Sequence, residues 1–227
     1  MTNPFKNFTI KDWLLLVLSL AAVTVSNMLS GDADVLTLFT TCVGVTSLVL
    51  AAKGHPLAMA LMVVFGILYA VISAGCRYWS EVITYLGMSV PMSFWSFITW
   101  LKHPSENGNE VAVRKIGIRQ WGILSAFCVP VTVFFYFIMK MLDTPNLFVS
   151  TLSIITSFMA AGLTILRSPY YALFYAMNDV VLMVLWSIAA LQEPGYIPVV
   201  INFSIFLIND IYGFISWKRR EHGSTKG

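Results

Sequence analysis

Long apolar stretches separated by short polar connections run through the whole chain. Eight of these stretches are long enough, at about 20 residues each, to cross the hydrocarbon core of a bilayer as helices. They are Trp13–Leu29, Val35–Ala52, Pro56–Cys76, Ser80–Trp100, Gln120–Leu142, Leu147–Leu166, Tyr170–Leu191 and Tyr196–Trp217. The pattern therefore predicts an all-α integral membrane protein with eight transmembrane helices.

The composition supports this fold class. Hydrophobic residues make up 58% of the 227 positions and charged residues 11%, whereas a soluble domain has about 25% charged residues. The first stretch has a second interpretation as a signal peptide, because Lys6 and Lys11 precede it. Asp12 interrupts that basic region, and no small-residue cleavage motif follows, so we expect a transmembrane helix.

The basic residues are segregated by topology. With eight crossings, both termini lie on one side, together with all but two of the 14 lysine and arginine residues; Arg77 and Lys140 fall on the other side. The positive-inside rule makes the basic side cytoplasmic. Asp32, Asp34, Asp143 and Glu193 fall on the opposite side. The net charge of +3 is thus explained by basic residues that set the membrane topology, and it does not indicate nucleic-acid binding.

Three short matches recur in the same order in both halves of the chain. The sequence VTS at 45–47 matches ITS at 155–157, HP at 55–56 matches SP at 168–169, and FITW at 97–100 matches FISW at 214–217. The offsets are 110, 113 and 117 residues. Their order and their equivalent positions in the predicted helices indicate an internal duplication.

The duplication predicts an arrangement of one, three, one and three helices. We divide the chain into an N-terminal tail with an extra helix (1–34), a first three-helix repeat (35–100), a cytoplasmic loop with a linker helix (101–142), a second three-helix repeat (143–217) and a basic tail (218–227). One linker helix makes the repeats parallel, related by an axis along the membrane normal. Such a bundle is typical of transporters, although a fold alone does not establish a function.

Polar and aromatic residues inside the predicted spans are the candidates for a binding site, since such positions are costly in lipid. In the seventh span Tyr171, Phe174 and Asn178 are spaced i, i+3 and i+7, so one helix face carries two rings and an amide. These groups can stack on a planar ring and hydrogen-bond its edge. The alternatives are packing or an interfacial belt for the rings, and a helix-to-helix hydrogen bond for Asn178 beside Asp179.

Other spans contribute further candidates. The last span carries Asn202, Asn209 and Asp210, and the fourth carries Glu81, Thr84, Tyr85 and Met88. Pro91 in the fourth span is expected either to bend the helix and open space for a ligand or to be a simple packing kink. We expect Trp100 and Trp217, at equivalent ends of the two repeats, to anchor at the membrane interface.

No enzymatic motif is apparent. The sequence has no phosphate-binding glycine loop, no HExxH and no nucleophile set near a histidine. His55, His103 and His222 fall in loops or the tail and are expected at the surface, while Cys42, Cys76 and Cys128 are expected to act as small hydrophobic residues. We therefore predict no catalytic residues, no metal and no cofactor.

The segment YWSEVITYLGMSVP at 78–91 and the closing NDIYGFISW at 209–217, together with the helix order, resemble the PnuC family of bacterial vitamin transporters. The similarity extends over residues 12–220. It implies a homotrimer in the bacterial cytoplasmic membrane that imports nicotinamide riboside for NAD biosynthesis by facilitated diffusion, with a cytoplasmic kinase trapping the product.

The resemblance also bears on the site. The family's ligand helix carries tryptophan, tryptophan and asparagine at i, i+3 and i+7, which correspond here to Tyr171, Phe174 and Asn178. Both tryptophans are thus replaced by smaller rings, a change that leaves thiamine, riboflavin or a deoxynucleoside as alternative substrates. A non-transporting membrane subunit or sensor is the alternative from another class. Proton coupling through Asp179 and Asp210 stays open.

Overall fold

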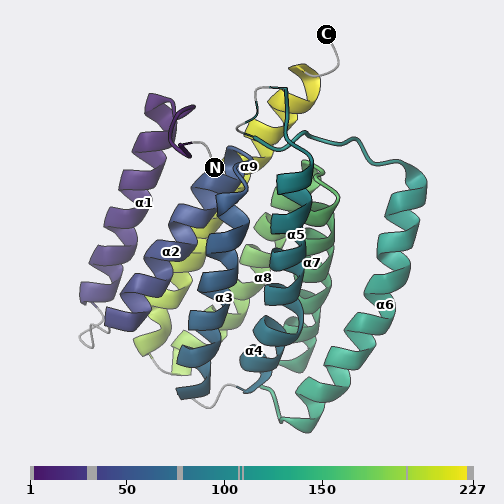
Figure 1. The fold of residues 1–227 in the computed structure, drawn as a ribbon. Helices are drawn as coiled ribbons and strands as arrows, with labels where there is room; N and C mark the ends of the chain where they lie inside the picture. Colours follow the sequence, from purple (N-terminus) through teal and green to yellow (C-terminus); the bar gives the residue numbers. More distant parts are fainter. Residues whose placement is uncertain are drawn as a thin grey trace.

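The computed structural model describes residues 3–29, 35–75, 79–106, 108, 110–192 and 194–223, and this part of the chain is helical apart from loops and one isolated β-bridge. The elements are α1 (Ile10–Leu29), α2 (Val35–Ala52), α3 (Leu57–Gly75), α4 (Trp79–Thr84), the π-helical turn η1 (Tyr85–Ser89), α5 (Val90–Lys102), α6 (Ile118–Met141), α7 (Leu147–Ile165), α8 (Tyr170–Gln192), the 3-10 turn η2 (Pro194–Tyr196) and α9 (Ile197–Gly223) (Figure 1). Expectations for Asp32, Asp34, Cys76, Arg77 and Glu193 fall outside the described residues.

The prediction of eight transmembrane helices is confirmed. Within the described ranges, eight helical segments have the length and apolar composition needed to cross a membrane, and α4, η1 and α5 together form one of them. The largest difference from the expected ends is in α9, which continues past Trp217 to Gly223. An ion pair between Lys218 Nζ and Glu221, 2.8 Å long and three residues apart, supports this polar extension.

The helices form one bundle in which α1 and α6 stand at opposite edges (Figure 1). The first turn of α1 and the last turn of α9 lie at the same end of the bundle, where α2 and α5 also end. We call this end the basic side, because Lys11, Lys53, Lys102 and Arg219 lie there, and the other end the far side. α1 packs against α2 and α9.

Two tryptophans near the basic side link the two halves of the chain. Trp100 and Trp217 are both 0% exposed, and their rings lie 5.3 Å apart. Trp100 Nε1 donates to the carbonyl of Thr164 (3.0 Å), and Trp217 Nε1 donates to that of Ala51 (2.8 Å). The prediction that they anchor at the membrane interface is therefore wrong, because each indole N–H is satisfied by a backbone carbonyl in the other half.

The loop before α6 also contacts both halves. The Val111 amide donates to the carbonyl of Gly54 (2.9 Å), and the Arg114 amide donates to that of Arg167 (3.0 Å). Gly54 and Arg167 both have a positive φ, of 70° and 59°, and they are separated by the same offset as the HP and SP matches. These paired contacts support the proposed duplication.

His55 corrects another expectation. It is 5% exposed, so the prediction of a surface position is wrong, and its Nδ1 accepts a hydrogen bond from the Leu57 amide at the start of α3. A histidine one residue before Pro56 can satisfy a free amide of the helix that follows. The expected exposed positions of His103 and His222 are confirmed, and Cys128 is buried as expected of a small hydrophobic residue.

Changing Gly54 to alanine is expected to lower the free energy of unfolding by about 1–2 kcal/mol, the cost of a left-handed conformation with a Cβ. The added Cβ would also meet the Arg220 guanidinium. The melting temperature in detergent would report the loss. Gly122→Ala is the matched control, because nothing lies within 4 Å of a Cβ there and the glycine is in a helix; equal melting temperatures for the two variants would contradict the prediction.

Candidate functional site

A polar cavity of about 50 Å³ lies beside Asn178, where α7, α8 and the π-helical turn η1 meet. Its polar lining includes Glu81, Thr84, Ser150, Ser153, Ser157 and Asn178. The turn η1 is the local irregularity that faces this space. The Val90 amide bonds to the carbonyl of Tyr85, five residues back, and Pro91 has no amide hydrogen to continue the α-helical pattern. Such π-bulges are frequent at functional sites.

The side chain of Asn178 is held in one orientation. Its Oδ1 accepts hydrogen bonds from Ser153 Oγ (2.9 Å) and from Thr156 Oγ1 (2.8 Å), both on α7. Among the described residues no acceptor is bonded to its Nδ2 group. Because the two hydroxyl groups bond to the amide oxygen of Asn178, its amide nitrogen stays available as a hydrogen-bond donor at the cavity wall.

A wider vestibule adjoins this cavity on the far side. It has a volume of about 390 Å³ and shares Glu81, Thr144, Ser150 and Leu185 with the Asn178 cavity. Its wall also includes two aromatic side chains, Trp186 and Tyr196, and the polar side chain of Gln192. This volume lies in the range of small-molecule sites, whereas the Asn178 cavity alone holds only a group of a few atoms.

A second cavity, of about 190 Å³, lies on the other side of Tyr85, a residue that lines both spaces. Its wall is mainly aromatic, with Phe65, Tyr69 and Tyr85 in ring contact; the centroids of Tyr69 and Tyr85 are 4.5 Å apart. Asn202 also lines it, and its buried Oδ1 has no hydrogen-bond donor among the described residues. We call it the Asn202 cavity.

The two cavities occupy equivalent positions in the proposed duplication. Several residues of α2 and α3 that line the Asn202 cavity have a counterpart 113 residues later, on α7 or α8, that lines the Asn178 cavity; this is the offset of the HP and SP matches. Tyr85 and Asn202 are 117 residues apart, which is the offset of the FITW and FISW matches. The first set of pairs is Thr37 with Ser150, Thr40 with Ser153, and Phe65 with Asn178. The second half therefore carries an amide where the first carries an aromatic ring.

Two acidic residues face each other between α8 and α9. Asp179 and Asp210 are neighbours, and both side chains are buried. Neither residue lines the two cavities.

The remaining predicted site residues lie elsewhere. Tyr171 is buried between Trp100 and Trp217, and its hydroxyl donates to the carbonyl of Ala51 (3.1 Å). Phe174 packs beside Trp121 of α6. Two others also have packing or helix-to-helix contacts: Met88 lies in a core cluster with Phe135, Met139 and Ile154, and Asn209 Nδ2 donates to Ser19 Oγ of α1 (3.0 Å). The structure does not bring Tyr171 and Phe174 to the Asn178 cavity, so their stacking role stays a prediction.

The sequence-based prediction missed the hydroxyl groups of α7 that line the Asn178 cavity. A signal for these groups exists, because Ser150, Ser153 and Ser157 are spaced i, i+3 and i+7 and so share one helix face. This spacing is the same as that of Tyr171, Phe174 and Asn178 in the following span.

Comparison with known proteins identifies the family to which the chain belongs. The profile of the family described as nicotinamide mononucleotide transporter matches residues 34–219. The chain is also similar to the nicotinamide riboside transporter PnuC of Neisseria mucosa, with 26% identity over 214 residues, which cover 91% of this chain and 80% of that protein. The chain belongs to the PnuC family of transporters. As a PnuC-family member it is a multi-pass membrane transporter and not an enzyme.

The fold agrees with that membership. A crystal structure of the vitamin B3 transporter PnuC superposes with a TM-score of 0.81 over 95% of this chain and 94% of that one, at 22% sequence identity. The PnuC fold is thus present along nearly the whole chain.

Proposed function

We propose that this PnuC-family protein imports nicotinamide riboside by facilitated diffusion and that a cytoplasmic kinase traps the product. The observation that carries the proposal is the fixed amide of Asn178 in a hydroxyl-lined cavity that adjoins a vestibule of about 390 Å³. The similarity to a transporter named for nicotinamide riboside supports the same substrate.

The chemistry of the site suits this ligand. Nicotinamide riboside carries a cationic ring with a carboxamide and a ribose with several hydroxyl groups. The Nδ2 group of Asn178 would donate to the carboxamide oxygen, and the serine hydroxyls of α7 would bond to polar groups of the ligand. The Glu81 carboxyl, which lines both the cavity and the vestibule, would face the positive ring.

The proposed topology and assembly follow from charge and family. The basic side would face the cytoplasm, with both termini there, in a bacterial cytoplasmic membrane, and the protein would be a homotrimer, as the family resemblance implies. The Asp179–Asp210 pair lines neither cavity, so it would not act as a proton relay in the cycle. Transport would then be passive.

Proteoliposomes test this function directly. Vesicles loaded with unlabelled nicotinamide riboside are expected to show saturable counterflow of the labelled compound, and an imposed pH gradient should change neither its rate nor its final level. Protein-free vesicles are the control. Uptake that follows the pH gradient would overturn the passive mechanism, and no counterflow with stable, folded protein would overturn transport of this substrate.

Tyr171 and Phe174 stand where the family has tryptophans, so the substrate must also be tested by competition between nicotinamide riboside and other vitamins or nucleosides. Thiamine, riboflavin and deoxynucleosides should neither compete for counterflow nor raise the melting temperature, whereas nicotinamide riboside should do both, because a ligand that binds only the native state stabilises it. Stabilisation by one of the others would move the proposal to that substrate. Stabilisation without counterflow would indicate a sensor.

A further inference from the structure

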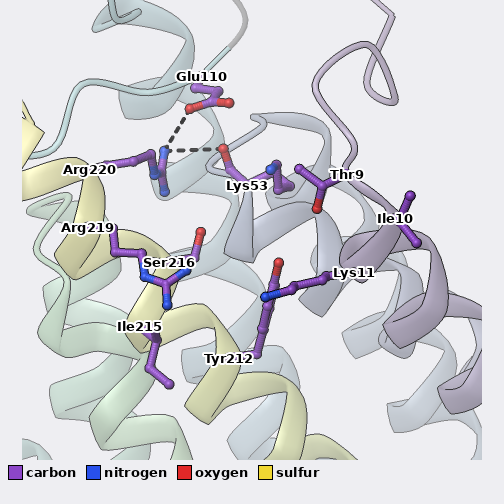
Figure 2. Close-up of a pocket in the computed structure, with 10 residues that line it drawn as sticks. All are labelled: Thr9, Ile10, Lys11, Lys53, Glu110, Tyr212, Ile215, Ser216, Arg219 and Arg220. Atoms are coloured by element: carbon purple, nitrogen blue, oxygen red, sulfur yellow. Dashed lines mark hydrogen bonds and ion pairs between the residues drawn. The ribbon is translucent and has the colours of Figure 1, made fainter.

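A fourth pocket, of about 640 Å³, lies at the basic side between the start of α1 and the end of α9 (Figure 2). None of the residues that line it also lines the Asn178 cavity, the vestibule or the Asn202 cavity. It is therefore separate from the proposed transport site. Its wall combines basic side chains with the exposed isoleucines Ile10 and Ile215.

The pocket carries an excess of positive charge. Lys11, Lys53, Arg219 and Arg220 line it together with one acid, Glu110. Lys53 is paired with Asp12 (3.1 Å) and Arg220 with Glu110 (3.3 Å). Lys11 and Arg219 have no acidic partner among the described residues. Figure 2 shows these two side chains extending toward one another across the pocket, one from each helix.

Exposed apolar side chains continue from the pocket along both helices. On α1, Leu14 and Leu18 follow Ile10 at intervals of four residues. On α9, Ile211 and Ile208 precede Ile215 at intervals of four and three residues. Residues spaced in this way share a helix face, so each isoleucine of the pocket begins an apolar track that runs from the basic side into the span.

We propose that this pocket binds the phosphate headgroup of an anionic phospholipid, with its acyl chains along the two tracks. Lys11 and Arg219 supply the charge for the phosphate, and basic pockets between transmembrane helices are known to bind such headgroups. A soluble phosphate would use the two cations but not the tracks. The combination of unpaired cations with adjoining apolar faces therefore favours a lipid.

Native mass spectrometry of the purified protein tests the site. The wild-type protein should retain phosphatidylglycerol in preference to phosphatidylcholine with the same acyl chains. The double variant Lys11→Gln/Arg219→Gln should bind phosphatidylglycerol about 30-fold more weakly, since each basic residue near the membrane surface contributes about a fivefold gain in affinity. Unchanged melting temperatures without added lipid would show that the variant is folded.

The matched control is Lys102→Gln/Arg119→Gln. It removes the same charge from exposed positions of the basic side that do not line the pocket, and its affinity should stay within about twofold of wild type. Equal losses in both double variants would overturn the site in favour of general attraction to the protein's charge. Equal binding of phosphatidylcholine would also overturn it. Displacement of bound phosphatidylglycerol by inorganic phosphate at equal concentration would assign the pocket to a free anion instead.

Discussion

Replacing Asn178 with alanine is expected to abolish counterflow of nicotinamide riboside. Among the described residues that line the Asn178 cavity, Asn178 alone has a side-chain amide. Losing a hydrogen bond to a buried polar group of the ligand costs about 2–3 kcal/mol, or about 100-fold in uptake. The fold should survive, because Thr156 Oγ1 also bonds to the carbonyls of Leu152 and Ser153 within α7. Initial rates in proteoliposomes measure the effect.

Asn7→Ala is the matched control for that experiment. Asn7 is exposed, and its Nδ2 donates to Glu110 outside the membrane-spanning helices, so uptake should equal that of the wild type. A melting temperature of the Asn178 variant close to wild type would show that lost uptake reflects the site. Normal uptake by the Asn178 variant would remove this residue from the substrate site.

Replacing Trp217 with alanine is expected to give the largest loss of stability. The ring is fully buried against Trp100 and Tyr171, and its Nε1 satisfies the carbonyl of Ala51. Truncating a buried tryptophan costs about 3–5 kcal/mol, which corresponds to a fall in melting temperature of about 10 °C for a chain of this size. Thermal unfolding of the purified protein in detergent measures the fall.

Two further variants separate the causes. Trp217→Phe keeps most of the ring and loses the hydrogen bond, so it should cost only about 1 kcal/mol. Trp95→Ala removes a tryptophan that is 64% exposed in α5 and should change the melting temperature little. Similar falls for the Trp95 and Trp217 alanine variants would contradict a structural role for the buried pair.

The helices were predictable because their determinants are local. Apolar length alone locates a membrane span, and seven of the eight expected spans begin within two residues of the observed helices. The end of α9 was less predictable, since Lys218 and Glu221 look like a polar tail until their ion pair is seen.

The roles of individual side chains depend on partners distant in the sequence, so they could not be predicted in the same way. A tryptophan at the end of a span has the same local pattern whether it meets lipid headgroups or the carbonyl of another helix, as Trp100 and Trp217 do. The shared face of Tyr171, Phe174 and Asn178 was similarly ambiguous. In the structure Tyr171 packs against two tryptophans and Phe174 packs beside Trp121 of α6, and neither ring lines the cavity at Asn178.

The carbonyl of Ala51 has a consequence for the order in which the protein matures. It accepts hydrogen bonds from Tyr171 and Trp217, which follow it by 120 and 166 residues. The ribosome must therefore complete six of the eight spans and begin the seventh before the first of these bonds can form, and it must synthesise most of α9 before the second. Until then the Ala51 carbonyl accepts only the local hydrogen bond from the Gly54 amide, and the contacts that join the two halves there are absent. Nascent chains halted before residue 171 are therefore expected to be substrates for quality-control proteases.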